Sequence, residues 1–448
     1  MNLTIQRQSL IDALSIASAP VDSDPQQPIL ASVRLTLGAD LELVGTDLVT
    51  TAVAHVPADG HEGACCANAR TLIERVKLLP EGTIRLRLES TAAIRGGTLH
   101  IEGGSRKFAL AVRDAGEFPA TAEISKPAGG NAVASSVLAS LLDRGGSAMS
   151  DDKGAQAIKR VVAITTADGW TETGSACNNA GASSGLDTGL PDHVEALIPF
   201  RGVEILRRFF GGKGNVRLEI IDRRIVASRD ASSVAVLLAD PTIAPASGHQ
   251  YRGFGGFAEK AENAITITVS RAAIIDAVSA IASASEMHQV ELYAEGDKLR
   301  IVGRSDQGEP AEDEIACSTD GKVESIVSGD LLTKMLRLAT SDKVTIRIPP
   351  PIETPQPMMI KEIGELDARA WWIIMPIMPS AYKSRPEAKK ASEKPNGDTS
   401  VAGEKNGKEK KSRKKKDSPA PEAPTTTAQS VAPTQAAVDD DTGDEAFE

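Results

Sequence analysis

Features that mark metalloproteins and secreted proteins are scarce in this sequence of 448 residues. There are only 4 cysteines, without a Cys-x-x-Cys spacing, and the adjacent Cys65 and Cys66 are poor disulfide partners. The 6 histidines are scattered, with no His-x-His or His-x-x-x-His pair. We therefore expect free thiols in a reducing compartment, no metal site and no cofactor.

Long apolar runs and catalytic constellations are also missing. No stretch of about 18 apolar residues exists, and Met1–Arg7 has neither the apolar core of a signal peptide nor the Arg-rich character of a transit peptide. The Gly- and Ser-rich segment Gly174–Gly185 lacks the Lys-Ser/Thr ending of a phosphate-binding loop, and no base is specified beside Cys177. The sequence favours a soluble, cytoplasmic, non-catalytic protein without membrane contact.

An internal repeat is the strongest signal that is present. A short strand-like motif ending in glycine recurs at an interval of 129 residues, and an alternating apolar and basic strand follows it in each block at intervals of 132 and 130. The period is that of one small domain, so the chain predicts three similar domains. The first motif is Leu41–Gly45, Trp170–Gly174 and Leu299–Gly303; the second is Ile84–Leu86, Val216–Leu218 and Ile346–Ile348.

Each block combines amphipathic helices with alternating strands. Apolar residues recur at intervals of three and four in segments such as 68–79, 199–213 and 328–339, which is typical of helices with one buried face. Strands such as Ser32–Leu37 alternate apolar and polar residues and are followed by turn residues. We predict an α+β fold with helices packed on one face of antiparallel sheets.

Breaks in these patterns divide the chain into domains at 1–125, 131–250 and 262–380, followed by a tail at 381–448. The tail has almost no large apolar side chains, so it cannot bury enough surface to fold alone. It is a charge diblock: residues 383–416 hold 13 basic and 5 acidic residues, and residues 417–448 hold 8 acidic and no basic ones. Such blocks are usually solvated or interaction tails.

The net charge of −11 disfavours nucleic acid at first sight, but its distribution does not. Within residues 1–380 the predicted helices sum to +6 and the remainder to −17. Basic helices on an acidic body form an electrostatic footprint for a polyanion, although ordinary solvated helix faces would give the same composition. The candidate DNA-binding residues are Arg70, Arg75, Lys77, Arg201, Arg207, Arg208, Lys334 and Arg337.

Several stretches, in order and in register with the triplication, resemble the bacterial sliding clamp, the beta subunit of DNA polymerase III. The resemblance covers roughly residues 1–380 and is strongest in the first and third domains. The stretches that carry it are Gln27–Leu30, Val44–Leu48, Asn68–Arg70, Leu79–Gly82, Ser105–Leu110, Gly116–Pro119 and Trp372–Ile377.

The resemblance implies a head-to-tail homodimer that closes into a ring, with paired helices facing a central hole and sheets outside. Such a clamp is a non-catalytic processivity factor that encircles duplex DNA without reading its sequence and tethers the polymerase. By resemblance, Arg70 matches a DNA-contacting arginine, and Phe108, Leu110 and Ile281 belong to the dimer interface.

The resemblance also implies a pocket between the second and third domains that receives a short apolar peptide from the polymerase alpha subunit, the clamp loader and repair proteins. An ordinary buried terminal strand is the alternative for its C-terminal wall, and alternate residues could serve both. The matching positions are Gly174, Cys177, Asn178, Asn179, Ile373, Ile374, Met375, Pro376 and Ile377.

Three departures from the family pattern favour a divergent paralogue. Gly174–Asn179 reads Gly-Ser-Ala-Cys-Asn-Asn where the family has Thr-Asp-Gly-His-Arg-Leu, and an arginine expected near Asp22–Asp24 is replaced. The chain also continues for about 70 residues after the segment at which family members normally end. The alternative to a loaded clamp is therefore a clamp-derived interaction scaffold that neither dimerises nor loads.

Overall fold

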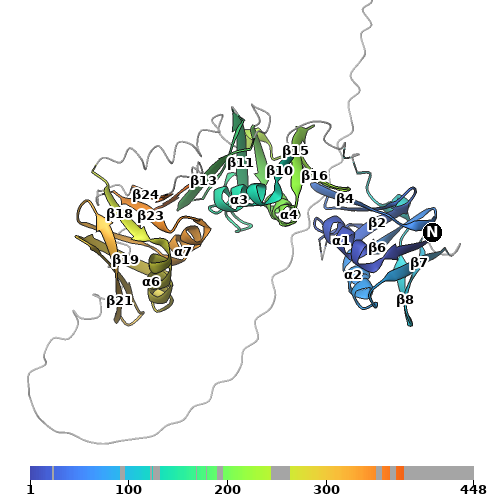
Figure 1. Ribbon diagram of the computed structural model, residues 1–448, viewed down its shortest axis with the longest axis horizontal. Helices are drawn as coiled ribbons and strands as arrows, with labels where there is room; N and C mark the ends of the chain where they lie inside the picture. The colour runs from blue at the N-terminus through green and yellow to red at the C-terminus, as the bar shows by residue number, and fades with distance from the viewer. Residues whose placement is uncertain are drawn as a thin grey trace, which may run out of the picture. The chain divides into compact units, whose positions relative to one another are not determined.

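The computed structural model shows an α+β chain with antiparallel sheets (Figure 1). Asn178 and the predicted tail lie outside the described residues, as do most of the residues at the two predicted domain boundaries. The described residues are 1–22, 25–90, 96–121, 124, 132–167, 169–177, 179–188, 195–243, 263–349, 356–363 and 370–377.

One order of elements recurs three times in these residues: a strand, a helix, a run of strands, a second helix and three closing strands. The first copy, here called repeat one, also contains the short strand β5 (Asp59–His61). Its other elements are β1 (Asn2–Gln6), α1 (Arg7–Ala17), β2 (Ser32–Leu37), β3 (Leu41–Thr46), β4 (Thr50–Val56), β6 (Gly63–Asn68), α2 (Ala69–Lys77), β7 (Thr83–Ser90), β8 (Gly97–Gly103) and β9 (Arg106–Val112).

Repeats two and three follow the same plan. Repeat two contains β10 (Ala132–Ala134), α3 (Ser135–Gly145), β11 (Val161–Ala167), β12 (Trp170–Ala176), β13 (Ala180–Asp187), β14 (Glu195–Pro199), α4 (Phe200–Phe210), β15 (Asn215–Ile221), β16 (Arg224–Arg229) and β17 (Ser232–Leu237). Repeat three contains β18 (Ile265–Ser270), α6 (Arg271–Ser283), β19 (Gln289–Glu295), β20 (Lys298–Arg304), β21 (Pro310–Thr319), β22 (Val323–Ser328), α7 (Gly329–Leu338), β23 (Lys343–Ile348), β24 (Met358–Glu362) and β25 (Trp371–Ile374). The predicted α+β class is confirmed.

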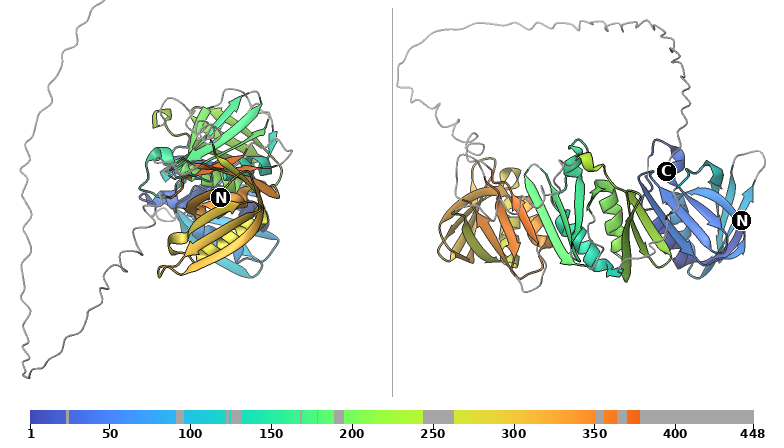
Figure 2. Two further views of the ribbon diagram at one scale, coloured as in Figure 1. Left: turned by 90° about the vertical axis from the view of Figure 1, so that its left-hand side faces the viewer. Right: turned by 90° about the horizontal axis from the view of Figure 1, so that it is seen from above.

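Each helix pair packs against the sheets of its own repeat (Figures 1 and 2). Leu72 of α2, Val203 of α4 and Leu332 of α7 occupy the same place in their helices and are all fully buried. Arginines also tie the helices of a pair together: Arg7 Nε donates to the carbonyl of Val76 at 3.1 Å. Arg271 Nε likewise donates to Ser341 at 2.8 Å, just beyond α7. The helix pairs are therefore fixed by both apolar packing and backbone capping.

The glycine that ends the repeated motif marks a close approach between helix and sheet. A Cβ at Gly45 would lie 1.9 Å from the carbonyl oxygen of Ala17, and one at Gly303 would lie 1.9 Å from Ser285 Oγ. No side chain fits between the end of the first helix and the second strand of the sheet. The period of the motif therefore reflects a steric requirement of the fold.

The sheets continue from one repeat into the next. Strand β17 pairs antiparallel with β4, which joins repeats one and two in an 8-stranded sheet. Strand β25 pairs antiparallel with β13, which joins repeats two and three in a 12-stranded sheet. In both cases the last strand of a repeat adds to the hairpin in the first half of the preceding repeat.

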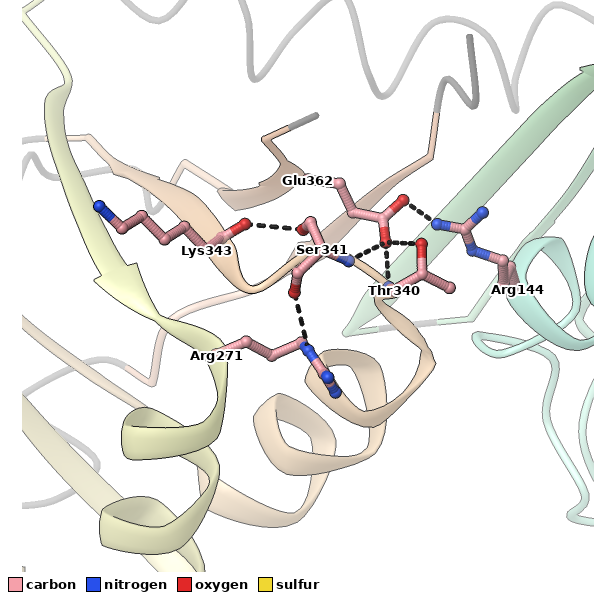
Figure 3. Close-up of polar contacts among 6 residues, drawn as sticks. All are labelled: Arg144, Arg271, Thr340, Ser341, Lys343 and Glu362. Carbon is pink, nitrogen blue, oxygen red and sulfur yellow. Dashed lines mark hydrogen bonds and ion pairs between the residues drawn. The ribbon is translucent and has the colours of Figure 1, made fainter. Parts of the chain in front are cut away.

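A buried ion pair reinforces the joint between repeats two and three (Figure 3). Arg144 at the end of α3 donates to Glu362 on β24, and their side chains are only 4% and 8% exposed. Glu362 also accepts from the hydroxyl of Thr340 at 3.1 Å and the backbone N–H of Ser341 at 3.4 Å. The Arg144 guanidinium lies 5.7 Å from the ring of Trp372, and burial lowers its pKa.

Replacing Gly45 tests the close approach of helix and sheet. Gly45→Ala should lower the free energy of unfolding by roughly 1–3 kcal/mol, because α1 must move off the sheet to admit the methyl group. Gly38→Ala is the matched control, since nothing lies within 4 Å of a Cβ at that position. Equal stability of the two variants in urea titrations would contradict the steric explanation.

Replacing Glu362 tests the ion pair. Glu362→Gln should lower the free energy of unfolding by about 3–5 kcal/mol, because it leaves the buried Arg144 charge without a counterion. The double variant Arg144→Met/Glu362→Gln should recover most of this loss, since no buried charge remains. Urea unfolding of the three proteins checks both statements, and a double variant less stable than Glu362→Gln would refute them.

Candidate functional site

The two joints between repeats use one strand register. In the first, Val236 lies opposite Thr50, and the N–H of Leu237 donates to the carbonyl of Val49 at 2.8 Å. In the second, Ile374 lies opposite Ala180, and the N–H of Met375 donates to Asn179 at 2.9 Å. Each last strand thus meets the tip of a hairpin in the same way.

The chain after each last strand also bonds to its own repeat at equivalent positions. The N–H of Arg113 donates to the carbonyl of Cys66 at 2.9 Å, that of Ala239 to Leu197 at 2.8 Å, and that of Ile377 to Ile326 at 2.7 Å. Arg113, Ala239 and Ile377 therefore correspond, and counting back makes Leu110 the equivalent of Val236 and Ile374.

Two strands of the kinds used in the joints have an edge that no joint covers within the described part of the chain. Strand β9 pairs along its length with β8 alone. Residues 310–316 of β21 pair with β20 alone. Strand β9 is the last strand of repeat one, and β21 is the hairpin strand of repeat three. Each joint pairs a last strand with a hairpin strand, so one strand of each kind has no joint partner within the chain. Open edges of this kind are templates for strand pairing.

The predicted dimer-interface residues lie at or near these edges. Phe108 and Leu110 are half-buried residues of β9 that pack against the core of repeat one. Ile281 of α6 is only 7% exposed and belongs to the core of repeat three. It approaches Gly303, and Gly303 is the partner of Ala311 on β21. In the structure, two of the three predicted residues therefore lie on the open edge of β9, and the third lies behind the open edge of β21.

Sequence reasoning missed the charges on these edges. Arg106 and Lys107 lie on β9, whereas Glu312 and Asp313 lie on β21. Glu312 accepts an ion pair from Arg300 on the neighbouring strand at 3.7 Å. The opposite signs of the two strands are visible in the sequence, but only the sheet order shows that both are edges.

The predicted basic residues occupy equivalent places on the second helix of each repeat. Lys77, Arg208 and Arg337 all lie in the last turn, eight residues after the first residue of α2, α4 and α7, and all three are exposed. Lys334 of α7 is exposed one turn earlier. One cation per repeat thus recurs at a fixed position, which composition alone could not show.

The other predicted cations have partners within the chain. Arg70 is 82% exposed but pairs with Glu74 at 3.0 Å, and Arg201 pairs with Glu204 at 3.4 Å. The Arg75 guanidinium lies 5.3 Å from the ring of Phe108. Arg207 binds Asp143 at 2.8 Å and the carbonyl of Leu142 at 2.8 Å, which joins α4 to α3. A structural contact therefore holds the side chains of Arg75 and Arg207.

The residues predicted for the partner-peptide pocket divide into three groups. Cys177 and Asn179 at the hairpin tip meet the half-exposed Met375, Pro376 and Ile377 at the end of β25. Asn178 lies outside the described residues.

The remaining pocket residues are buried. Ile374 is fully buried beside Trp372, and Ile373 packs with Met359 on the opposite face of the sheet. Gly174 is buried on β12, with β13 between it and β25. The alternation that the sequence predicted for this strand is present, and Gly174 is not brought to β25.

The thiols and acidic groups form no reactive arrangement in the described residues. Burial raises the pKa of Cys65 to about 12 and that of Cys66 to about 11, and Cys177 Sγ donates to Asn179 at 3.2 Å. In the same residues, no three His, Cys, Asp or Glu side chains gather as a metal site would require. No helix of the described ranges has the length and apolar character needed to span a membrane.

Comparison with known proteins finds similar sequences and similar folds. Residues 1–122 match the family model for the DNA polymerase III beta subunit, N-terminal domain. The chain is 24% identical to a beta sliding clamp of Pseudomonas aeruginosa over 328 residues, which cover 72% of this chain and 85% of that protein. It is 30% identical to the beta sliding clamp of Micrococcus luteus over 131 residues, 29% of this chain and 40% of that protein.

Solved structures show the same fold. A DnaN sliding clamp from Pseudomonas aeruginosa bound to griselimycin superposes with a TM-score of 0.73 at 22% identity, covering 84% of this chain and 99% of that chain. A DNA polymerase sliding clamp from Bacillus subtilis gives 0.74 at 16% identity, with the same coverage. The chain is thus related to the bacterial sliding clamps, the beta subunits of DNA polymerase III, in sequence over its first 122 residues and in fold over 84% of its length.

Proposed function

We propose that this protein is a non-catalytic DNA sliding clamp, a head-to-tail homodimer that closes around duplex DNA and tethers a polymerase. The observation that carries the proposal is the pair of open edges on β9 and β21. Each is the type of edge that the chain joins twice within itself, and a second copy supplies the missing partner for both. Closure by two identical joints follows from two-fold symmetry.

The register of the internal joints predicts the register between protomers. Leu110 corresponds to Val236, and Glu309 corresponds to Thr50 because both accept the N–H that closes the hairpin tip. Leu110 then faces Glu309 of the second copy, and Phe108 faces Ala311. Phe108 would cover Ile281, which lies behind Gly303 and Ala311. The three interface residues expected from the sequence thus meet in one place.

The same register places residues of opposite charge across from each other. Arg106 would face Asp313, and Lys107 would face Glu312. Opposite charges across antiparallel strands each contribute roughly 0.2–1 kcal/mol, and they also disfavour the reversed pairing of β9 with β9. The apolar pair at Phe108 and Leu110 supplies most of the affinity, and the charges fix the register.

Contact with DNA would use the recurring cations Lys77, Arg208 and Arg337, together with Lys334 and Arg70. Phosphates bound by such side chains carry no base sequence, as sliding requires. Retention comes from the closed ring, so these cations need to supply only weak contacts. Tethering then raises the effective concentration of the polymerase at its template.

The polymerase alpha subunit and the clamp loader would bind at the joint between repeats two and three. Met375, Pro376 and Ile377 are half-exposed there beside the hairpin tip at Cys177 and Asn179. The polar residues of this tip are the feature that favours the alternative function, a scaffold that binds other partners and does not load.

Charge reversal at Arg106 and Asp313 tests the predicted dimer register. Arg106→Glu or Asp313→Arg alone should raise the dimer Kd roughly tenfold, or about 1.4 kcal/mol, and the two together should restore it. Sedimentation velocity across micromolar concentrations measures this. Lys322→Glu is the control, because Lys322 pairs with Glu295 inside the chain at 3.0 Å.

Dimers of equal affinity in all four variants would refute this register. A wild-type protein that is monomeric at micromolar concentration would refute the dimer and favour the scaffold.

Retention on closed DNA tests the ring. Protein placed on nicked circular DNA by the clamp loader of its own cell should stay bound through gel filtration and be lost when the circle is cut. The triple variant Lys77→Ala/Arg208→Ala/Arg337→Ala should also be retained on circles, because topology holds it, while its affinity for short linear duplexes falls. Equal retention of the wild type on circular and linear DNA would exclude a ring.

A further inference from the structure

The joint between repeats one and two exposes large apolar side chains to solvent. Leu48 is 54% exposed, Val49 42% and Leu237 37%. Six large apolar side chains of the described residues are exposed to this degree or more, and three of them lie at this joint. They are contiguous, since Leu48 and Val49 form the β3–β4 hairpin tip and Leu237 donates its N–H to the Val49 carbonyl.

The hairpin tip holds Leu48 outward. Leu48 has a φ of 73°, a left-handed conformation that a leucine rarely adopts. Its N–H donates to Thr46 Oγ1 at 3.0 Å, and the Asp47 carboxylate accepts the N–H of Val49 at 3.0 Å. Strained backbone that is over-determined by side-chain bonds points to a functional constraint on the exposed residue.

An arginine completes a row across three strands. Leu237 faces Arg224 on β16 and meets Val49 on its other side, so the three side chains lie on one face of the sheet. Val236, the preceding residue, is fully buried in the core of repeat two, so the row lies on the face turned away from α4. In the described residues the Arg224 side chain has no hydrogen-bond or ion-pair partner.

We propose that Leu48, Val49, Leu237 and Arg224, here called the joint patch, dock a short extended segment of another protein that carries apolar side chains next to a carboxylate. The Arg224 guanidinium, which has no ion-pair partner among the described residues, selects an acidic partner, and the adjacent leucines and valine select apolar side chains. Strands lie about 4.8 Å apart, so the row is about 10 Å wide. Same-face side chains of an extended peptide recur about every 6.6 Å. An acid placed over Arg224 then puts the apolar side chain two positions away between Leu237 and Val49, which lie about 4.8 and 10 Å from Arg224.

The joint between repeats two and three has different chemistry on the same backbone. Asn179 and Met375 stand there in the places of Val49 and Leu237. The joint patch is therefore a separate site with its own specificity, and it does not depend on ring closure or on DNA binding.

Selection from a phage library of random short peptides tests the proposal on the full chain. Peptides enriched on the wild type should carry large apolar residues with an acid two positions away. Their Kd should rise roughly tenfold or more with Leu48→Ser/Leu237→Ser and with Arg224→Glu. Leu78→Ser is the matched control, because Leu78 is 51% exposed and follows α2, outside the joint patch. It should leave the Kd unchanged.

Three results would overturn the proposal. These are a failure to enrich any peptide, peptides that bind the joint-patch variants as tightly as the wild type, or loss of self-association in Leu48→Ser/Leu237→Ser. The last result would make the joint patch an interface between copies of this chain. Thermal melting confirms that each variant is folded, and because the substituted side chains are exposed or half-exposed, the melting temperatures should match.

Discussion

Pairing of backbone groups at the ends of each repeat is the constraint on which the rest of the structure depends. A repeat built of hairpins ends in strands with unpaired N–H and C=O groups, and such edges must be paired, covered or blunted. Here β17 and β25 satisfy theirs by adding to β4 and β13. Because the joint always uses a last strand and a hairpin strand, a finite chain leaves one of each unused. The number of repeats does not change this remainder, and pairing with a second copy would remove it.

The two joints share one backbone arrangement, but their side chains give them different surfaces. At the second joint the hairpin tip is polar, and a buried Arg144–Glu362 pair spans the repeats. A buried pair costs desolvation that its attraction barely offsets, so its net contribution to stability is small, whereas leaving one partner unpaired is costly. At the first joint no such pair is seen in the described residues, and apolar side chains reach solvent. Both joints combine backbone hydrogen bonds with buried apolar packing, since Ala52 belongs to the core of repeat two and Ala182 to that of repeat three. The exposed side chains of each joint are left available for partners.

The sequence revealed what is local and periodic. The motif glycines Gly45 and Gly303 are required because the helix lies against the sheet there, and amphipathic periodicity located the second helices correctly. It could not show pairings between distant residues. Arg144 and Glu362 are 218 positions apart, and no pattern links them. Arg207 was predicted as a DNA-binding residue because it belongs to a basic helix, yet it binds Asp143 and the carbonyl of Leu142 on α3. The open edges were invisible for the same reason, since strand order is a property of the folded sheet.

The placement of charge explains how an acidic chain could hold a polyanion. Arg70 and Arg201 each form an ion pair with a carboxylate one turn away, whereas Lys77, Arg208 and Arg337 have no carboxylate partner in the described residues. All three lie in the last turn of a helix, where the backbone dipole favours a cation and holds it without an acid. Salt screens the remaining acidic surface beyond about 8 Å, so distant carboxylates do not cancel them. Because each repeat carries one such cation at the same position, the attraction for a phosphate would be weak and equal in every repeat. In the proposed complex a duplex held in this way would have no preferred rotational setting, and the contact would resist neither translation nor rotation along the DNA.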